Sequence, residues 1–218
     1  SFAWSDEELD SWNLSPWRLN VQVTLGCNHR CLSCSLRKRH PDELALVEWQ
    51  AVLREGVEHL GVRAVSLTGG EPLSRPDTAE IISFIRSLGV PHVGMSSNMT
   101  LLRSPADARR LIEAGLTGAT VSYHGVGTHD RFTGREGSEE KVRRSLRWIR
   151  EVAHGLGVPF ELRVATVLTT FNSAALEDVL EFCEEIGATL YPELPDTSLP
   201  FFAGTGIAQA GRIEDSAI

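Results

Sequence analysis

Short strand-like runs alternate with longer amphipathic runs along most of this chain, and this alternation limits its possible folds more than any other feature. Six runs rich in β-branched and other apolar residues predict strands at 19–25, 64–68, 92–97, 119–123, 160–168 and 189–193. Five runs with apolar residues every three or four positions predict helices at 42–60, 77–88, 106–114, 139–155 and 174–186. Helical runs followed by glycine, as at Gly61 and Gly187, are typical of helix ends.

Strand and helix units repeated six times predict parallel strands joined by right-handed crossovers. Because a complete barrel of this type needs eight units, we expect an α/β fold with a partial (β/α)6, three-quarter TIM barrel in a single domain. Residues 1–18 form an expected lead segment, 19–193 the core domain and 194–218 a C-terminal extension. Functional side chains are expected at the carboxyl ends of the parallel strands.

The composition is that of an ordinary globular domain, with 42% hydrophobic and 23% charged residues among 218. No run approaches the roughly 20 apolar residues that cross a membrane, so we expect no membrane partner. The net charge of −8 argues against a nucleic-acid partner. With no recognisable secretion signal, the expected location is the cytoplasm.

Three cysteines, Cys27, Cys31 and Cys34, follow the first predicted strand in the run LGCNHRCLSC. Three thiolates can bind three irons of a four-iron cluster and leave the fourth iron open, whereas ferredoxin clusters normally have four cysteine ligands. A zinc site is the alternative, with His29 or His40 as the fourth ligand. Disulfides are disfavoured because the cysteines are crowded and no secretory feature precedes them.

The fourth cysteine, Cys183, falls in a predicted helix on the same face as Leu176, Val179 and Leu180. Free cysteine is among the most frequently buried residue types and behaves as a small apolar side chain. We therefore expect a core thiol at Cys183 rather than a metal ligand.

The cysteine spacing, together with the Gly69-Gly70-Glu71-Pro72 turn after the second predicted strand, resembles the radical S-adenosylmethionine (radical SAM) enzymes. The resemblance extends over residues 19–193 and points to the branch with the molybdopterin cyclase and peptide-modifying maturases. It implies a [4Fe-4S] cluster on the three cysteines and S-adenosylmethionine bound to the open iron. Reductive cleavage of S-adenosylmethionine then gives a 5'-deoxyadenosyl radical that takes hydrogen from a substrate. Ser33 departs from the family pattern, which often has an aromatic residue before the third cysteine.

The resemblance also implies which residues bind the cofactor. The turn residues Gly69, Gly70 and Glu71 correspond to those that bind the methionine amino group. Ser97 and Asn98, at the end of the third predicted strand, correspond to a polar pair that suits the ribose hydroxyls. These five residues are therefore expected in the cofactor site.

Four further residues are expected there. Ser122, in the run VSYHG, matches a family serine that contacts the ribose or the carboxylate of the cofactor. Arg135 resembles an arginine that pairs with the cofactor carboxylate. Arg163 and Thr166 belong to the fifth predicted strand, whose barrel-facing residues contact adenine or methionine.

Candidate catalytic, substrate-facing residues are His124, Tyr123 and Glu193, with Tyr191 beside them; His124 takes the place of a family aspartate. Histidine suits proton transfer because small shifts move its pKa across neutrality. The expected partners are a small-molecule or peptide substrate and a reductant such as flavodoxin or ferredoxin. A non-catalytic iron-sulfur or zinc module and a glycyl-radical activase are the alternative functions.

Overall fold

The structure is a computed structural model that describes residues 17–34 and 43–194. One sheet contains six strands in chain order, and every neighbouring pair is parallel. The strands are β1 (Arg18–Thr24), β2 (Ala64–Gly69), β3 (His92–Ser97), β4 (Gly118–Ser122), β5 (Glu161–Val167) and β6 (Thr189–Glu193). This confirms the predicted α/β fold with a parallel sheet in a single domain. Residues 1–16 and 195–218, most of the two predicted end segments, lie outside the described residues.

Helices connect the strands. The α-helices are α2 (Leu46–Leu60), α3 (Thr78–Ser87), α4 (Pro105–Glu113), α5 (His129–Thr133), α6 (Ser138–Leu156) and α7 (Leu176–Ile186), with 3-10 turns η1 (Pro72–Ser74) and η2 (Ser173–Ala175). Five of the helices match predicted ones, and α2 and α7 end at Gly61 and Gly187 as expected. The predicted first residue of α2, Asp42, lies outside the described residues. Helix α5 was not predicted, because five residues are too few to show a helical period.

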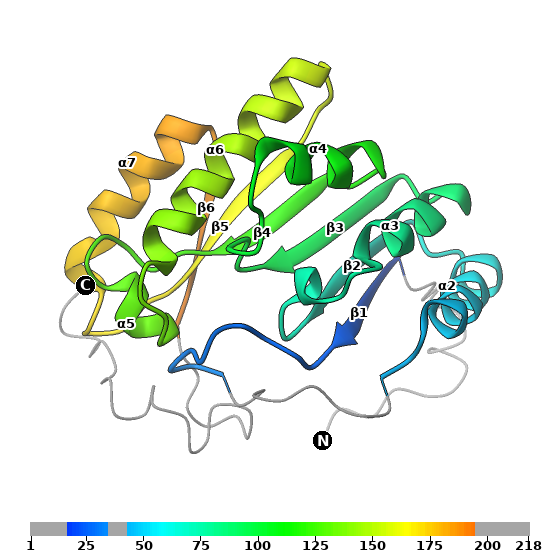
Figure 1. Ribbon diagram of the computed structural model, residues 1–218, viewed down its shortest axis with the longest axis horizontal. Coiled ribbons are helices and arrows are strands. Elements are labelled where there is room, and N and C mark those ends of the chain that lie inside the picture. Colours follow the sequence, from blue (N-terminus) through cyan, green and yellow to red (C-terminus); the bar gives the residue numbers. More distant parts are fainter. Residues whose placement is uncertain (1–16, 35–42, 195–218) are drawn as a thin grey trace, which may run out of the picture.

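The sheet has an apolar face and a polar face. Figure 1 shows α3, α4, α6 and α7 arranged side by side along one side of the curved sheet. On β2, Val65 and Leu67 are buried in the hydrophobic core, whereas Ser66 and Thr68, which alternate with them, are only partly buried. Because side chains alternate along a strand, the second pair faces the inner side of the sheet, opposite the helices. Among the described residues, β2 thus presents polar side chains on this inner face.

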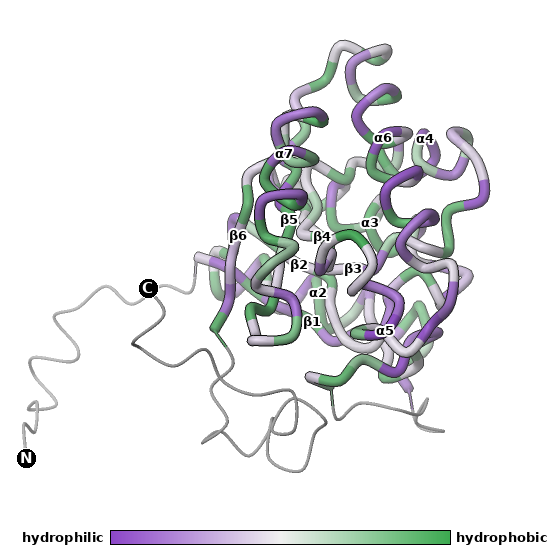
Figure 2. Tube along the Cα trace, turned by 90° about the vertical axis from the view of Figure 1, so that its left-hand side faces the viewer, coloured by the Kyte–Doolittle hydropathy of each residue, from purple (hydrophilic) through white to green (hydrophobic). Residues whose placement is uncertain are grey.

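The covering helices are amphipathic. Figure 2 shows hydrophilic and hydrophobic stretches alternating along α6 and α7. On α7, Val179 and Cys183 are buried, which confirms the predicted core thiol, but Leu180 is 44% exposed and so does not belong to the buried face. Within the described ranges, none of the helices combines the length and apolar character needed to cross a membrane.

Leu67 offers a test of the core. Its side chain is 0% exposed and lies on β2 between Val21 of β1 and Met95 of β3. We expect Leu67→Ala to lower the free energy of unfolding by about 2–5 kcal/mol, because the change removes buried methyl groups and leaves a cavity. Leu180→Ala, at an exposed site, is the matched control and should change it by about 0.5 kcal/mol or less. If urea denaturation gave the same decrease in the free energy of unfolding for both variants, this assignment of the core would be contradicted.

Candidate cofactor site at the carboxyl ends of the strands

Three partly buried cysteines lie on the loop that follows β1. Burial raises the pKa of the Cys31 thiol to about 12, and the neighbouring Cys27 and Cys34 add to the rise, so the three sulfurs are close enough to interact. In the described part of the chain, no three His, Cys, Asp or Glu side chains converge tightly enough for a single metal ion. A four-iron cluster makes no such demand, because each thiolate binds a different iron. Three neighbouring thiols can therefore bind three irons of such a cluster and leave the fourth iron open.

Helix α5 holds one end of the cysteine loop. The backbone N–H of Arg30 donates to the carbonyl of Thr133, and that of Leu32 donates to the carbonyl of Phe132, both at 2.9 Å. Figure 1 shows this loop running beneath the strand ends from β1 towards α5. The thiols are thus fixed between the first βα unit and the fourth.

The turn after β2 holds the other end. The N–H of Gly70 donates to the carbonyl of Thr24 at 2.8 Å, and the N–H of Glu71 donates to that of Gly26 at 2.7 Å. A Cβ atom on Gly69, which has φ of 131°, would lie 2.0 Å from the Thr24 oxygen. A Cβ on Gly70 would lie 2.2 Å from the Gly26 oxygen. Both glycines are therefore required where the turn and the cysteine loop meet.

The Glu71 side chain is a structural carboxylate. It is 0% exposed and accepts hydrogen bonds from the Ser97 hydroxyl at 2.7 Å, the Asn98 N–H at 2.6 Å and the Leu73 N–H at 3.0 Å. Burial raises its pKa even though the three donors act in the opposite direction. The resemblance implied that this carboxylate and Ser97 contact the cofactor, but the structure directs them to each other. Together they tie the turn to the end of β3.

The end of β4 separates its residues between the two faces of the sheet. Ser122 is partly buried on the inner face, and no hydrogen bond of its side chain is found within the described residues. Tyr123 is 0% exposed, and its hydroxyl accepts a hydrogen bond from Arg143 of α6 at 2.9 Å. Its ring packs against Phe182 of α7. The prediction that Tyr123 faces a substrate is wrong, because the side chain points into the helical layer.

His124 belongs to a buried cluster of histidines. Its backbone N–H donates to Nδ1 of His129 at 3.2 Å, so neutral His129 carries its proton on Nε2, which lies 3.0 Å from the Ser138 hydroxyl. That hydroxyl lies 3.1 Å from Nε2 of His29. The His124 ring packs against Phe132 and is 3% exposed, and its Nδ1 has no hydrogen-bond partner among the described residues. The expected open position for His124 is therefore wrong.

The two predicted sites on β5 are also displaced. Thr166 is 1% exposed and donates its hydroxyl hydrogen to the Tyr123 carbonyl at 2.6 Å. It shares a face with the core residues Leu162 and Val164, so the prediction that it faces the barrel interior is wrong. Arg163 does lie on the inner face, paired with Glu161, but at the amino-terminal half of the strand.

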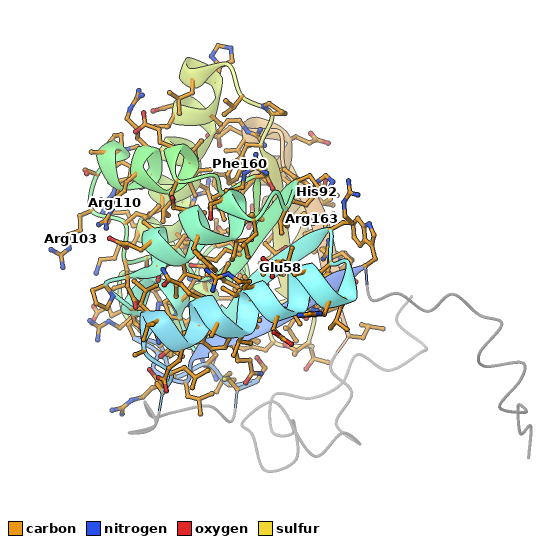
Figure 3. All side chains as sticks on the ribbon, turned by 90° about the vertical axis from the view of Figure 1, so that its right-hand side faces the viewer. Glu58, His92, Arg103, Arg110, Phe160 and Arg163 are labelled. Atoms are coloured by element: carbon orange, nitrogen blue, oxygen red, sulfur yellow. The ribbon has the colours of Figure 1, made fainter. Side chains whose placement is uncertain are left out.

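A cavity of about 660 Å³ lies at that amino-terminal end, with Trp17, His92, Phe160 and Arg163 in its lining. Figure 3 shows His92, Phe160 and Arg163 gathered at this end of the sheet. The cysteine loop is at the opposite end, after the carboxyl end of β1. Arg163 thus lies towards the end of the sheet opposite the cysteine loop, and its contact with the cofactor stays a prediction.

Three predicted residues occupy exposed positions. Arg135 lies between α5 and α6. Burial lowers the pKa of His29 most, and the positive charge of Arg135 lowers it further, which places Arg135 near the cysteine loop. Glu193 and Tyr191 are exposed on β6, which pairs with β5 alone among the described strands. Glu193 stands at the carboxyl end, as predicted for a substrate-facing residue, but nothing in its surroundings indicates a reaction.

Some residues near the thiols were not predicted at all. Asn28 and Thr100 pack against Asn98 beside Cys27, and Ser138 contacts His29. The sequence around them did not indicate these contacts, because their partners are distant in the chain. The hydroxyl side chains on the inner face could have been predicted, because polar and apolar residues alternate along the strands: Thr68, Ser96 and Thr120.

Glu71→Gln tests the structural carboxylate. In either amide orientation the new NH2 group faces a backbone N–H, that of Asn98 or that of Leu73. We expect a loss of about 1–3 kcal/mol in the free energy of unfolding, the usual cost of unsatisfied buried polar groups. Glu113→Gln, at an exposed residue of α4, is the control and should leave chemical denaturation nearly unchanged. An unchanged free energy of unfolding in Glu71→Gln would contradict the described hydrogen bonding.

The histidine cluster predicts a loss of stability in mild acid. Burial, aided by His29 and opposed by Asp130, lowers the pKa of His129 from 6.5 to about 3. Between these values the unfolded chain binds more protons, so the free energy of unfolding falls as the pH decreases. In protein without its iron-sulfur cluster, the free energy of unfolding should fall between pH 7 and pH 5, and His129 should account for roughly 2 kcal/mol of this decrease. Urea denaturation of His129→Asn should show a correspondingly weaker pH dependence, and equal dependence in both proteins would contradict the assignment.

Comparison with known sequences supports a family assignment. The model of the Radical SAM superfamily matches residues 21–185. A probable GTP 3',8-cyclase from Metallosphaera sedula is 36% identical over 180 residues, which are 78% of this chain and 52% of that protein. An AdoMet-dependent heme synthase from Nitratidesulfovibrio vulgaris is 29% identical over 180 residues, 82% of this chain and 46% of that protein. The chain spans about half the length of these curated relatives.

Solved structures share the fold. SuiB from Streptococcus suis bound to the precursor peptide SuiA has a TM-score of 0.73 at 18% identity, over 90% of this chain and 44% of that one. The anSMEcpe structure with bound AdoMet has a TM-score of 0.63 at 18% identity, over 81% of this chain and 50% of that one. The residues that the family model matches, 21–185, include the end of β1, the cysteine loop, the glycine turn and strands β2 to β5. The chain therefore belongs to the radical SAM superfamily, whose members use a [4Fe-4S] cluster and S-adenosylmethionine.

Proposed function

We propose that this protein cleaves S-adenosylmethionine reductively, with Cys27, Cys31 and Cys34 as the three ligands of its cluster. The observation that carries the proposal is the fixation of the thiol loop between the glycine turn and α5 by backbone hydrogen bonds. When bound, the cluster and S-adenosylmethionine supply one-electron chemistry that yields methionine and a 5'-deoxyadenosyl radical. The chain itself contributes position, because a loop held at both ends keeps in place the three sulfurs that would bind the cluster.

S-Adenosylmethionine would lie across the carboxyl ends of the strands. The backbone carbonyls of Gly69 and Gly70 suit the methionine amino group, because an amino group donates hydrogen bonds and carbonyl oxygens accept them. The Ser122 hydroxyl faces inward and suits a ribose or carboxylate oxygen. Arg135, exposed near the cysteine loop, suits the carboxylate as a charged donor. We also propose that the core domain extends over residues 19–193.

The substrate would be a small molecule or a peptide side chain held against the inner face of the sheet. Partly buried hydroxyl groups on three neighbouring strands support a polar substrate: Thr68, Ser96, Thr120 and Ser122. The relatives differ in the compounds they act on or make, since one name specifies GTP and another the synthesis of heme, while SuiB binds a precursor peptide. They therefore support the reaction class rather than one substrate. Glu193 and Tyr191 are the remaining candidates for substrate-facing side chains. A flavodoxin or ferredoxin in the cytoplasm is the proposed reductant.

Removal of one thiol tests the proposal. Anaerobic protein supplied with iron and sulfide, then dithionite and S-adenosylmethionine, should form 5'-deoxyadenosine. Cys27→Ala, Cys31→Ala and Cys34→Ala should each abolish this product and lower the iron content, because each removes one cluster ligand. Cys183→Ala is the matched control, since this buried core thiol lies on α7, and the variant should retain both product and iron. A reduced wild-type cluster that produces no 5'-deoxyadenosine would overturn the proposal.

A further inference from the structure

We propose that Asn98 is a positioning residue for the cluster: its side-chain amide donates a hydrogen bond to the Cys27 sulfur and raises the reduction potential of the bound cluster. The inference rests on the proposed role of Cys27 as a ligand. It also reassigns Asn98, which the sequence had suggested as a contact for the ribose of the cofactor.

The orientation of the Asn98 amide follows from its partners. Its Oδ1 accepts hydrogen bonds from the Thr100 backbone N–H at 3.0 Å and from the Thr100 hydroxyl at 2.7 Å. A backbone N–H can only donate, so the amide oxygen must face it. The NH2 group is therefore on the other side, directed at the cysteine loop.

Three side chains complete a closed ring of hydrogen bonds. Nδ2 of Asn98 donates to Oδ1 of Asn28 at 2.8 Å, and Nδ2 of Asn28 donates to the Thr100 hydroxyl at 2.9 Å. The Thr100 hydroxyl in turn donates to Oδ1 of Asn98, so each group has one consistent role. The ring connects the residue after Cys27 to the end of β3, across 70 positions of the chain.

The ring uses one of the two N–H bonds of the Asn98 amide. The same Nδ2 lies 3.9 Å from the Cys27 sulfur, within hydrogen-bonding reach of this large atom. The backbone N–H of His29 donates to the same sulfur at 3.4 Å. Since Asn98 is only 8% exposed, water has little access to its remaining N–H. The sulfur of Cys27 is thus the partner that the geometry gives to this donor.

Reduction of an iron-sulfur cluster adds negative charge that spreads over its sulfur ligands. A donor N–H stabilises this more negative state more than the oxidised state, so it raises the reduction potential. The effect is strong where the surroundings exclude water, because the local dielectric constant is low. Loss of the Asn98 amide should therefore make the cluster harder to reduce without removing a ligand.

The test is a redox titration of the holoprotein followed by the cluster EPR signal, with iron and sulfide contents measured separately. Asn98→Ala should retain the wild-type iron content. At the wild-type midpoint potential its ratio of reduced to oxidised cluster should fall about tenfold, equivalent to a shift of ~59 mV for a one-electron couple. Asn172→Ala is the matched control, because Asn172 is also a buried asparagine, just before η2, but its side chain bonds to Val167, Thr169 and His124 instead of a cysteine. Its midpoint should be that of the wild type.

A second variant covers the case in which Asn98→Ala loses the cluster or fails to fold. Asn98→Asp keeps the acceptor oxygen for Thr100 and replaces the donor towards Cys27 by a carboxylate oxygen, so its midpoint should also fall. An intact cluster with an unchanged midpoint in either variant would overturn this inference and leave the proposed function standing. A wild-type protein that binds no cluster would overturn the proposed function together with the inference.

Discussion

The contact between two stretches of backbone, residues 24–26 and 69–71, is the constraint on which the rest of the site depends. Two N–H groups of the turn donate to carbonyls of the cysteine loop, at distances that leave no room for a Cβ on Gly69 or Gly70. The loop therefore leaves β1 from a fixed point relative to β2. Helix α5 and the asparagine ring then act on a segment whose origin is already set.

Beneath the cysteine loop the packing is polar, in contrast to the aliphatic core between sheet and helices. Glu71, Asn98, His29 and His129 are at most 8% exposed, and apart from Nδ1 of His29 their polar side-chain atoms have hydrogen-bond partners. Apolar side chains can exchange places with little penalty, but a satisfied polar network fixes one arrangement of its donors and acceptors. Such a layer suits a site in which sulfur atoms must be held at set positions.

The sequence predicted the strand and helix order because periods of two and of about 3.6 residues are distinct. It also predicted which residues lie near strand ends, but for Tyr123 and Thr166 it failed on the face of the sheet that the side chain occupies. Adjacent strand residues point to opposite sides, so Ser122 faces inward while Tyr123 lies among the helices. For Thr166 the signal was present in its apolar neighbours Leu162 and Val164. The asparagine ring left no signal, because its members come from segments 70 residues apart.

The histidine contact beneath the loop also has a consequence for the order of events during synthesis. His29 and Ser138 are separated by 109 positions. At roughly 5–20 residues per second, a ribosome needs about 5 to 20 s to make that interval. Throughout this time the thiols exist without the segment that fixes them, exposed to oxidants and to competing metals. Iron that bound to the nascent chain would bind to a loop held only by the glycine turn and not yet by α5. We therefore expect the cluster to assemble after the fourth βα unit has formed.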